Sequence, residues 1–263
     1  MTIKYFLKMI ILGLTYPIKC TSYTSLIRTF LLRPRIFDMV SFTIQFIDRK
    51  RLYNYQKKGN YKSKEEKGAV EHNLSVLKKD KVYTSRRVEP FYQIAVNPYR
   101  EKINNEKLLI IGPRNRVELY QAWLYGFKWE NITAIDLFSI NKKIQEMNME
   151  KMKFENNTFD TIVMVNTMAY ATSVVKVLSE IGRVLKVGGV SVFNHSYVPT
   201  SILWPAEIIS GQKVKDFLNK INLKIYYYDA YEKINSLNHK QTSHIFGVRK
   251  FGEDHKPFDQ VNI

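Results

Sequence analysis

The chain has one cysteine, Cys20, among its 263 residues. A single thiol excludes an internal disulfide framework and a cysteine-based metal cluster, and it suits a reducing compartment. The five histidines lack the helical or hairpin spacing of metal ligands, so we expect no metal site. These absences indicate a protein of the cytoplasm that folds without disulfides or structural metal.

The sequence also lacks an apolar run long enough to cross a bilayer. The apolar core 9–14 is too short, and no clear cleavage pattern follows it, so we expect no export. Segment 26–47 is interrupted by Arg33, Pro34 and Asp38. It predicts one or two amphipathic helices, which either pack on the sheet of the main domain or lie on a membrane surface.

Two further absences narrow the class of protein. There is no internal repeat, and there is no G-x-G-x-x-G fingerprint, which disfavours a nucleotide-dependent oxidoreductase. Because 45% of the residues are apolar and 13% aromatic, the chain has the composition of a folded protein.

Positive charge is concentrated in the first part of the chain. Residues 1–107 hold 22 Lys and Arg against 9 Asp and Glu, whereas the remaining residues hold 19 against 15. The length suits one α/β domain of about 200 residues plus an extension. We therefore predict a basic N-terminal extension (1–100), a main domain (101–251) and a C-terminal tail (252–263).

The run from Arg49 to Lys67 combines basic residues with three tyrosines. Charge runs of this kind are usually solvated loops, and we expect a solvent-facing loop here. The alternatives are attraction to anionic lipid or to nucleic-acid phosphates, where the tyrosines would add stacking.

The main domain begins with short apolar runs typical of buried parallel strands. Leu108–Ile111 is followed by a Gly112-Pro113 turn and then by helical spacing from Val117 to Leu124, while Ile132–Ile135 ends in Asp136. An acid about 20 positions after the first turn of a doubly wound sheet reaches a ribose hydroxyl. Asp136 stands 24 positions after Gly112.

The pattern continues to the end of the domain. Thr161–Val165 predicts a third strand, an amphipathic helix runs from Val174 to Leu185, and the Gly188-Gly189 turn leads into a strand at Val190–Phe193. A helix is expected at Lys213–Ile221. Two β-rich runs follow it and predict an antiparallel final pair added to a mostly parallel sheet.

These segments resemble the class I S-adenosylmethionine-dependent methyltransferases of the type-11 group. NNTFDTIVMV followed by LSEIGRVLKVGGVSVF is similar to the turn, strand and helix end that this family places around its fourth and fifth strands. IIGPRN with DLFS resembles the subset with Gly-Pro-Arg in the first loop. The resemblance implies a Rossmann-like sheet, S-adenosylmethionine as cofactor, and a lid that includes 88–99.

The resemblance also implies the cofactor-binding residues. The first loop and Glu118 would hold the methionine part, Asp136 the ribose, and Leu137 with the Asn148 segment the adenine, while Asn166 and Tyr170 would face the methyl group. The implied set is Gly112, Pro113, Arg114, Asn115, Glu118, Asp136, Leu137, Asn148, Met149 and Asn166. The first loop has one glycine where the family usually has two or three, and Met147-Asn148 replaces a Gly-Asp pair.

Each of these residues also has an ordinary structural role available. Asp136 would cap a turn, Glu118 would complement its helix dipole, Arg114 would be a surface residue, and Asn148 and Asn166 would satisfy loop backbone. Tyr170 and His195 are the candidates for contact with the acceptor, and packing is the alternative for both.

Three classes of function remain open. The first is a methyltransferase acting on a small-molecule, glycan or lipid-linked acceptor, with the basic extension near its substrate, a membrane or nucleic acid. The second is a catalytically inactive relative that serves as a binding or assembly protein. The third is the disfavoured oxidoreductase. Methyl transfer demands no signature base, because positioning donor and acceptor in line does most of the work.

Overall fold

The computed structural model describes most of the main domain and one long N-terminal helix. The described residues are 27–59 without 29 and 32, 61, 67–74 without 69 and 72, 88–96, 103–113, 115–196, 210–234 and 240–252. Cys20, Arg114, the segment 9–14 and residues 253–263 of the tail lie outside them. Within the described residues, no helix combines the length and the apolar character needed to cross a lipid bilayer.

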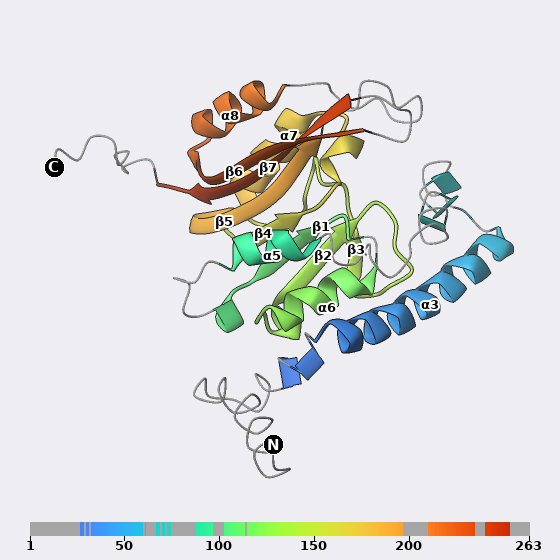
Figure 1. Cartoon of the computed structure of the whole chain (residues 1–263). Helices are drawn as coiled ribbons and strands as arrows, with labels where there is room; N and C mark the ends of the chain where they lie inside the picture. Colours follow the sequence, from blue (N-terminus) through green and yellow to red (C-terminus); the bar gives the residue numbers. More distant parts are fainter. Residues whose placement is uncertain are drawn as a thin grey trace, which may run out of the picture.

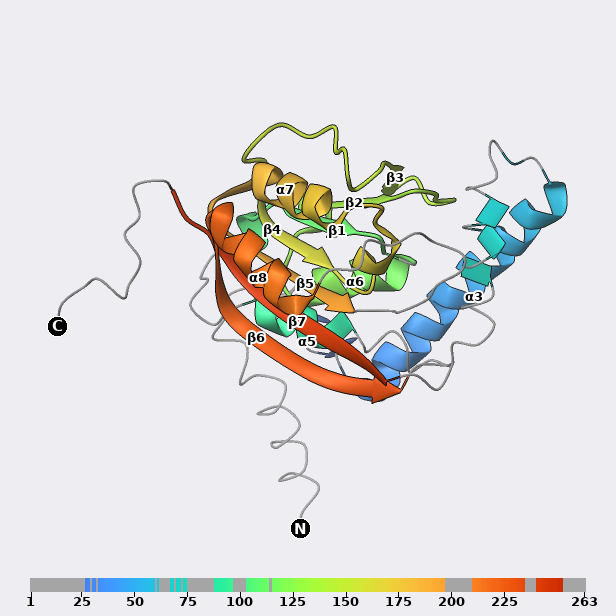
Figure 2. The ribbon, with the colours of Figure 1, turned by 90° about the horizontal axis from the view of Figure 1, so that it is seen from above.

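Seven strands form one sheet, with helices on both faces (Figures 1 and 2). The strand order is β3-β2-β1-β4-β5-β7-β6. The strands are β1 (Leu108–Ile111), β2 (Ile132–Asp136), β3 (Ile144–Glu146), β4 (Phe159–Met164), β5 (Leu185–Ser196), β6 (Leu223–Ile234) and β7 (Lys240–Lys250). The helices are α3 (Pro34–Lys58), α5 (Glu89–Ala95), α6 (Arg116–Leu124), α7 (Val174–Val184) and α8 (Gly211–Lys220), with 3-10 turns at Ile103–Asn105, Trp129–Asn131 and Met168–Tyr170.

The predicted mixed sheet is confirmed. β1 to β5 pair in parallel, and β7 pairs antiparallel with both β5 and β6. The first, second and third predicted strands form β1, β2 and β4 within one or two residues of their predicted bounds. β5 starts earlier than predicted, at Leu185, which pairs with Phe159 of β4. The predicted Gly188-Gly189 turn therefore lies within the bounds of β5.

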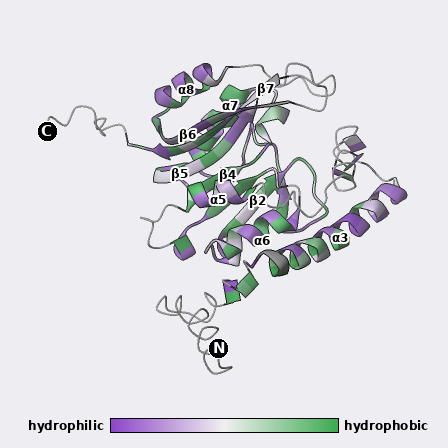
Figure 3. Cartoon of the chain, in the orientation of Figure 1, coloured by the Kyte–Doolittle hydropathy of each residue, from purple (hydrophilic) through white to green (hydrophobic). Residues whose placement is uncertain are grey.

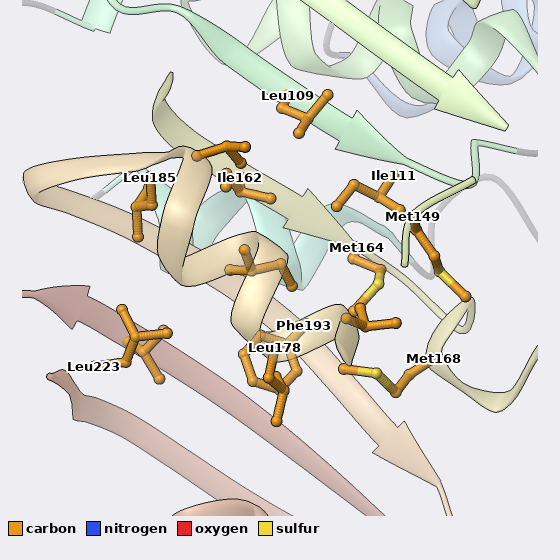
Figure 4. Packing of buried hydrophobic residues seen from close by; sticks show 14 of the residues in the cluster. Leu109, Ile111, Met149, Ile162, Met164, Met168, Leu178, Leu185, Phe193 and Leu223 are labelled. Atoms are coloured by element: carbon orange, nitrogen blue, oxygen red, sulfur yellow. The ribbon is translucent and has the colours of Figure 1, made fainter. Parts of the chain in front are cut away.

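One face of the sheet is covered by α7 and α8. In α7, Val174, Val177, Leu178 and Ile181 follow the spacing of a single helix face and are buried against the sheet. Figure 4 shows Leu178 packed near Met164 of β4 and Phe193 of β5. Each fully buried aliphatic or aromatic side chain of this kind contributes about 1.5 to 3 kcal/mol.

The opposite face is covered by α5 and α6. Phe91, Tyr92 and Ala95 of α5 pack on it together with Leu119 of α6. Val88, Phe91, Tyr92 and Ala95 are buried in the core, so residues 88–96 pack on the sheet and do not form the expected lid. Residues 97–99 of the expected lid lie outside the described residues.

The N-terminal extension contributes α3, a single helix of 25 residues. Pro34 stands in its first turn, where a missing N–H costs nothing, so it starts the helix rather than breaking one. The helix packs on α6 rather than on the sheet, with Phe37 stacked on Tyr120 at 6.3 Å between ring centroids. The loop predicted at Arg49–Lys67 is wrong for 49–58, which belongs to α3.

Candidate functional site at the carboxyl edge of the sheet

Four of the candidate segments meet where the parallel strands end. Ile111, the last residue of β1, pairs with Ile135 of β2 and with Met164 of β4. Gly112, Asp136 and Asn166 therefore lie at one edge of the sheet. The segment after β3 joins them, because Met147 N–H donates to the Asp136 carbonyl at 2.8 Å.

Gly112 makes the turn that leaves β1. Its φ of +68° is in the left-handed region that favours glycine, and its N–H donates to the Ile135 carbonyl at 2.8 Å. A Cβ at this position would overlap the side chain of Thr167. The first loop and the segment after β4 are therefore in tight contact, and Pro113 beside them is buried.

The positive end of α6 is already satisfied by the chain itself. Asn115 is the N-cap, and its Oδ1 accepts from Val117 N–H at 2.8 Å. Asp48 of α3 accepts from Arg116 N–H at 3.4 Å and pairs with the Arg116 guanidinium, with 2.7 Å between Nη2 and Oδ1. This buried carboxylate sits where a helix N-terminus would otherwise attract a ligand anion.

Asp136 ends β2 with its carboxylate in an unusual environment. Burial raises its pKa to about 7, the backbone N–H groups of Leu137 and Phe138 oppose that rise, and the charge of Glu118 adds to it. Leu137 N–H donates to Oδ1 at 2.7 Å. Leu137 itself is 52% exposed, so an apolar side chain stands in solvent beside a half-buried acid.

Glu118 lies behind Asp136, on the first turn of α6. It is 8% exposed, and its charge raises the pKa of Asp136. Burial, followed by the same charge, raises the pKa of Tyr92 well above its usual value. The Tyr92 hydroxyl donates to the Glu118 carbonyl at 2.9 Å. Two carboxylates thus face one small region, and a cationic group placed there would relieve their repulsion.

The segment after β3 is held by its own turn and by α7. Asn148 is exposed, and its Oδ1 accepts from Glu150 N–H at 2.8 Å, while Met149 is buried in the core of the sheet. Glu150 in turn accepts from the backbone N–H and the hydroxyl of Thr172, at 2.5 and 2.6 Å, which ties this segment to the one after β4.

Arg183 of α7 anchors the rest of that segment. Its guanidinium donates to the carbonyls of Met152 and Phe154, at 2.9 and 2.6 Å, and forms a two-point pair with Glu180. Glu180 also accepts from Met152 N–H at 2.6 Å. A fixed guanidinium fork suits this geometry better than a single ammonium group.

Arg183→Lys is therefore expected to destabilise the protein by about 1 to 3 kcal/mol, because at least one backbone carbonyl loses its charged donor. The measurement is the midpoint of urea unfolding. Lys153→Arg, at an exposed position of the same segment, is the matched control and should leave the midpoint unchanged. A midpoint for Arg183→Lys equal to that of the unmodified chain would contradict the anchoring role.

Asn166 follows β4 with a positive φ of 55°. It is paired with Asn194 of β5: Asn166 N–H donates to the Asn194 Oδ1 at 2.6 Å, and Asn194 Nδ2 donates to the Asn166 Oδ1 at 2.7 Å. This reciprocal pair fixes the backbone at the mouth of the sheet. Asn194 is a residue that the sequence did not indicate, because its partner lies 28 positions away.

The two acceptor-side candidates occupy different places. Tyr170 ends the 3-10 turn after β4 and is half-buried. His195 is 3% exposed and stands opposite His244 of β7, with 6.4 Å between the rings. Tyr228 of β6 shares a hydrogen bond of 2.9 Å with the His244 Nδ1, and Lys215 of α8 lies 3.6 Å from the Tyr228 ring centroid.

This histidine cluster is a second polar group that the sequence did not reveal. Burial, then the charges of His195 and Lys215, lower the pKa of His244, so it is neutral at pH 7. The register of β5 and β7 brings the two histidines together, and no local pattern encodes it.

The comparisons with known proteins agree with this arrangement. A protein-family model described as a methyltransferase domain matches residues 121–193, which run from α6 through β2 and β4 into β5. The curated proteins offer no match to the chain.

Solved structures similar to this chain share its fold alone. They include a SAM-dependent methyltransferase from Methanosarcina mazei (16% identity, 57% of this chain and 94% of that chain, TM-score 0.45). Another is a geranyl diphosphate methyltransferase in complex with SAM (12% identity, 63% of this chain and 85% of that chain, TM-score 0.48). A third is the YcgJ protein from Bacillus subtilis (13% identity, 65% of this chain and 100% of that chain, TM-score 0.44). Residues 121–193 thus match a methyltransferase domain, and the mostly parallel sheet around them is the one predicted for the class I S-adenosylmethionine-dependent methyltransferases.

Proposed function

We propose that the protein binds S-adenosylmethionine across the tips of β1 and β2 and transfers its methyl group to a small-molecule, glycan or lipid-linked acceptor in the cytoplasm. The family match on residues 121–193 carries this proposal, because the matched segment includes the ends of β2 and β4, which lie at this edge of the sheet.

The residues at the end of β2 fit the nucleoside half of the cofactor. The Asp136 carboxylate is an acceptor in a place of low polarity, where a hydrogen bond from a ribose hydroxyl is stronger than in water. Leu137 offers an exposed apolar side chain beside it, which suits contact with the face of an adenine ring. Asn148 keeps a second lone pair on its amide oxygen for the adenine edge.

Most groups near the expected position of the methionine half already have partners within the protein. Gly112 N–H is bonded within the sheet, Pro113 has no N–H, and the end of α6 is occupied by Asn115 and Asp48. We propose that the negative charge of the buried Glu118 attracts the ammonium of the methionine part. We expect cofactor affinity to come mainly from the nucleoside.

When bound, the cofactor supplies a sulfonium carbon open to in-line displacement. The protein's part is to hold the acceptor in line with that carbon and to keep water out. Asn166 is rigidly set by Asn194, and Tyr170 follows it at the same edge, so these two are the groups proposed to face the acceptor.

The test is titration calorimetry and thermal unfolding with S-adenosylmethionine and S-adenosylhomocysteine. At a free concentration of 100 times the dissociation constant, a ligand that binds only the folded state stabilises it by about 2.7 kcal/mol. We expect saturable binding of both compounds and no response to reduced nicotinamide dinucleotide. Absence of binding by both compounds would overturn the proposal.

A second candidate function follows from the filled end of α6. A chain whose own Asp48 and Asn115 satisfy that helix end has lost donors that a ligand would use, which favours a non-catalytic binding or assembly protein. Such a protein would unfold at the same temperature with and without either compound. The calorimetric result therefore separates the two candidates.

A further inference from the structure

One face of helix α3 is buried against the rest of the protein. Phe37, Ser41, Gln45, Asp48 and Leu52 follow one another at steps of three and four residues, and all are buried. This inner face contacts α6 through Phe37 and Asp48. Leu52 packs with Phe138 of the segment after β2.

The outer face of the first half of α3 is apolar and open to solvent. Met39 is 65% exposed, Phe42 56% and Phe46 60%, and the rings of the two phenylalanines are stacked with centroids 6.5 Å apart. Ile47 continues this surface, and Ile27 and Phe30 before the helix are also more than a third exposed. Large side chains of this kind clustered in solvent mark an interaction site.

The second half of the same helix is basic. Among the side chains of α3 that the structure describes, every exposed charge is positive: Arg49, Lys50, Arg51, Lys57 and Lys58. Asp48 is buried in its pair with Arg116, so it does not offset them on the outside. Figure 3 shows the change along α3, from mixed colours in its first part to mostly hydrophilic residues at its end.

We propose that the outer face of α3 docks on a membrane surface that contains anionic lipid. The apolar residues Met39, Phe42 and Phe46 enter the boundary between headgroups and acyl chains, and the basic residues that follow bind the lipid phosphates and carboxylates. Among the described side chains of this apolar half, residues 36–47, none is basic, which favours lipid over nucleic acid, because nucleic acid would need positive charge along the whole contact. A second copy of this chain would bring the same positive charge to the interface.

The position of α3 gives this contact a consequence for the site. Tyr55 of α3 lies 5.3 Å from the ring of Phe138, two residues beyond Asp136. Figures 1 and 2 both show α3 at the periphery of the molecule, away from α8. A bilayer bound to the outer face of α3 would therefore lie one helix away from the edge of the sheet, because the inner face of α3 contacts Phe138 just after β2. If the proposed methyl transfer holds, this favours the lipid-linked acceptor, while docking itself does not depend on it.

Co-sedimentation of the full chain with vesicles tests the proposal. Vesicles of phosphatidylcholine alone are compared with vesicles of equal parts phosphatidylcholine and phosphatidylserine. We expect binding to the anionic vesicles, weakened by added salt. We expect two double variants, Phe42→Ser/Phe46→Ser and Lys50→Glu/Lys57→Glu, each to bind these vesicles at least about tenfold more weakly than the unmodified chain.

The matched controls are Val187→Ser in β5 and Lys220→Glu at the end of α8, both exposed and on other elements. They should bind as the unmodified chain does, and circular dichroism should show all four variants folded. Equal vesicle binding by all proteins would overturn the proposal. So would a dimer in light scattering that only Phe42→Ser/Phe46→Ser dissociates, or RNA binding without vesicle binding.

Discussion

Asp136→Asn is expected to make the unliganded protein more stable at pH 8 and, at the same time, to weaken its binding of S-adenosylmethionine. The two effects have one cause. The carboxylate at the end of β2 is held in a place that disfavours its charge, and that same placement makes it a good acceptor for a ribose hydroxyl.

The sign of the stability effect follows from the direction of the pKa shift. The pKa of Asp136 is raised from 3.8 to about 7 in the folded protein, mainly by burial. Well below pH 4 the group is protonated in both the folded and unfolded states and does not affect stability. Between pH 4 and pH 7 the unfolded state ionises first, so the folded state becomes progressively less favourable, and above pH 7 the cost is complete.

The size of the effect is bounded by the same shift. A displacement from 3.8 to about 7 corresponds to about 4 kcal/mol. Because Asp136 keeps some contact with solvent, we expect about 2 kcal/mol at pH 8. Asparagine keeps a carbonyl oxygen for the Leu137 N–H and carries no charge at either pH.

Urea unfolding of both proteins at pH 8 and at pH 4 measures the difference. The gain should be present at pH 8 and nearly absent at pH 4. Asp229→Asn, which removes an exposed carboxylate on β6, is the matched control and should change stability little at either pH. A gain for Asp136→Asn that is equal at both pH values would contradict the burial of charge.

The same substitution, Asp136→Asn, should weaken binding of S-adenosylmethionine while it raises stability. Loss of a charged acceptor should weaken cofactor binding by about 1 to 3 kcal/mol, as seen by titration calorimetry. The unmodified protein should bind more tightly at pH 8 than at pH 6, because the ionised form of Asp136 is the better acceptor. A stability gain without a loss of affinity would leave Asp136 as a turn cap alone.

The sequence predicts the central strands because their information is local. Leu108–Ile111 and Ile132–Ile135 are continuous apolar runs, as expected of strands buried on both faces, and each forms its strand. β3 was not predicted because it is short and lies at the edge of the sheet. Of its three residues only Ile144 is buried, so it carries no pattern.

The helix over residues 49–58 was missed for a related reason. Its charge run suggested a loop, whereas the positions that decide its structure are Asp48, Leu52 and Tyr55, one turn apart on the inner face. These few residues stabilise the helix because Asp48 pairs with Arg116 of α6, and Leu52 and Tyr55 pack against Phe138. Without the tertiary contact, the charges dominate the pattern.

The candidate site shows the same division. The positions of Gly112, Asp136 and Asn166 at strand ends follow from the strand pattern. The contacts that decide what these residues can do join distant segments, such as Asp48 with Arg116, 68 positions apart, and Asn166 with Asn194. No periodicity in one sequence encodes such pairs.

Gly112→Ala is expected to cause the second large effect, a loss of about 3 kcal/mol of stability. Part of the loss, about 1 kcal/mol, comes from placing a side chain at a φ of +68°. The rest comes from overpacking against Thr167, whose side chain a new Cβ would overlap. Urea unfolding measures the sum.

Gly188→Ala separates the two contributions. Gly188 has a φ of +80°, and a Cβ there would meet nothing within 4 Å. This variant should therefore lose about 1 kcal/mol, the backbone part alone. Equal losses in the two variants would contradict the tight contact between the first loop and the segment after β4.

Removal of the Thr167 side chain should relieve the overlap with a Cβ at position 112. In the double variant Gly112→Ala/Thr167→Gly, the overlap is gone, so the loss should be smaller than the sum of the two single losses, and the coupling between them measures the contact. Thr167 directly follows Asn166, which is proposed to face the acceptor, so the same variants also test the site. Titration of the two single variants and the double variant with cofactor tests whether the narrow single-glycine loop limits binding. We expect Thr167→Gly to bind the cofactor more tightly than the unmodified chain. Equal affinity would show that the loop does not limit binding.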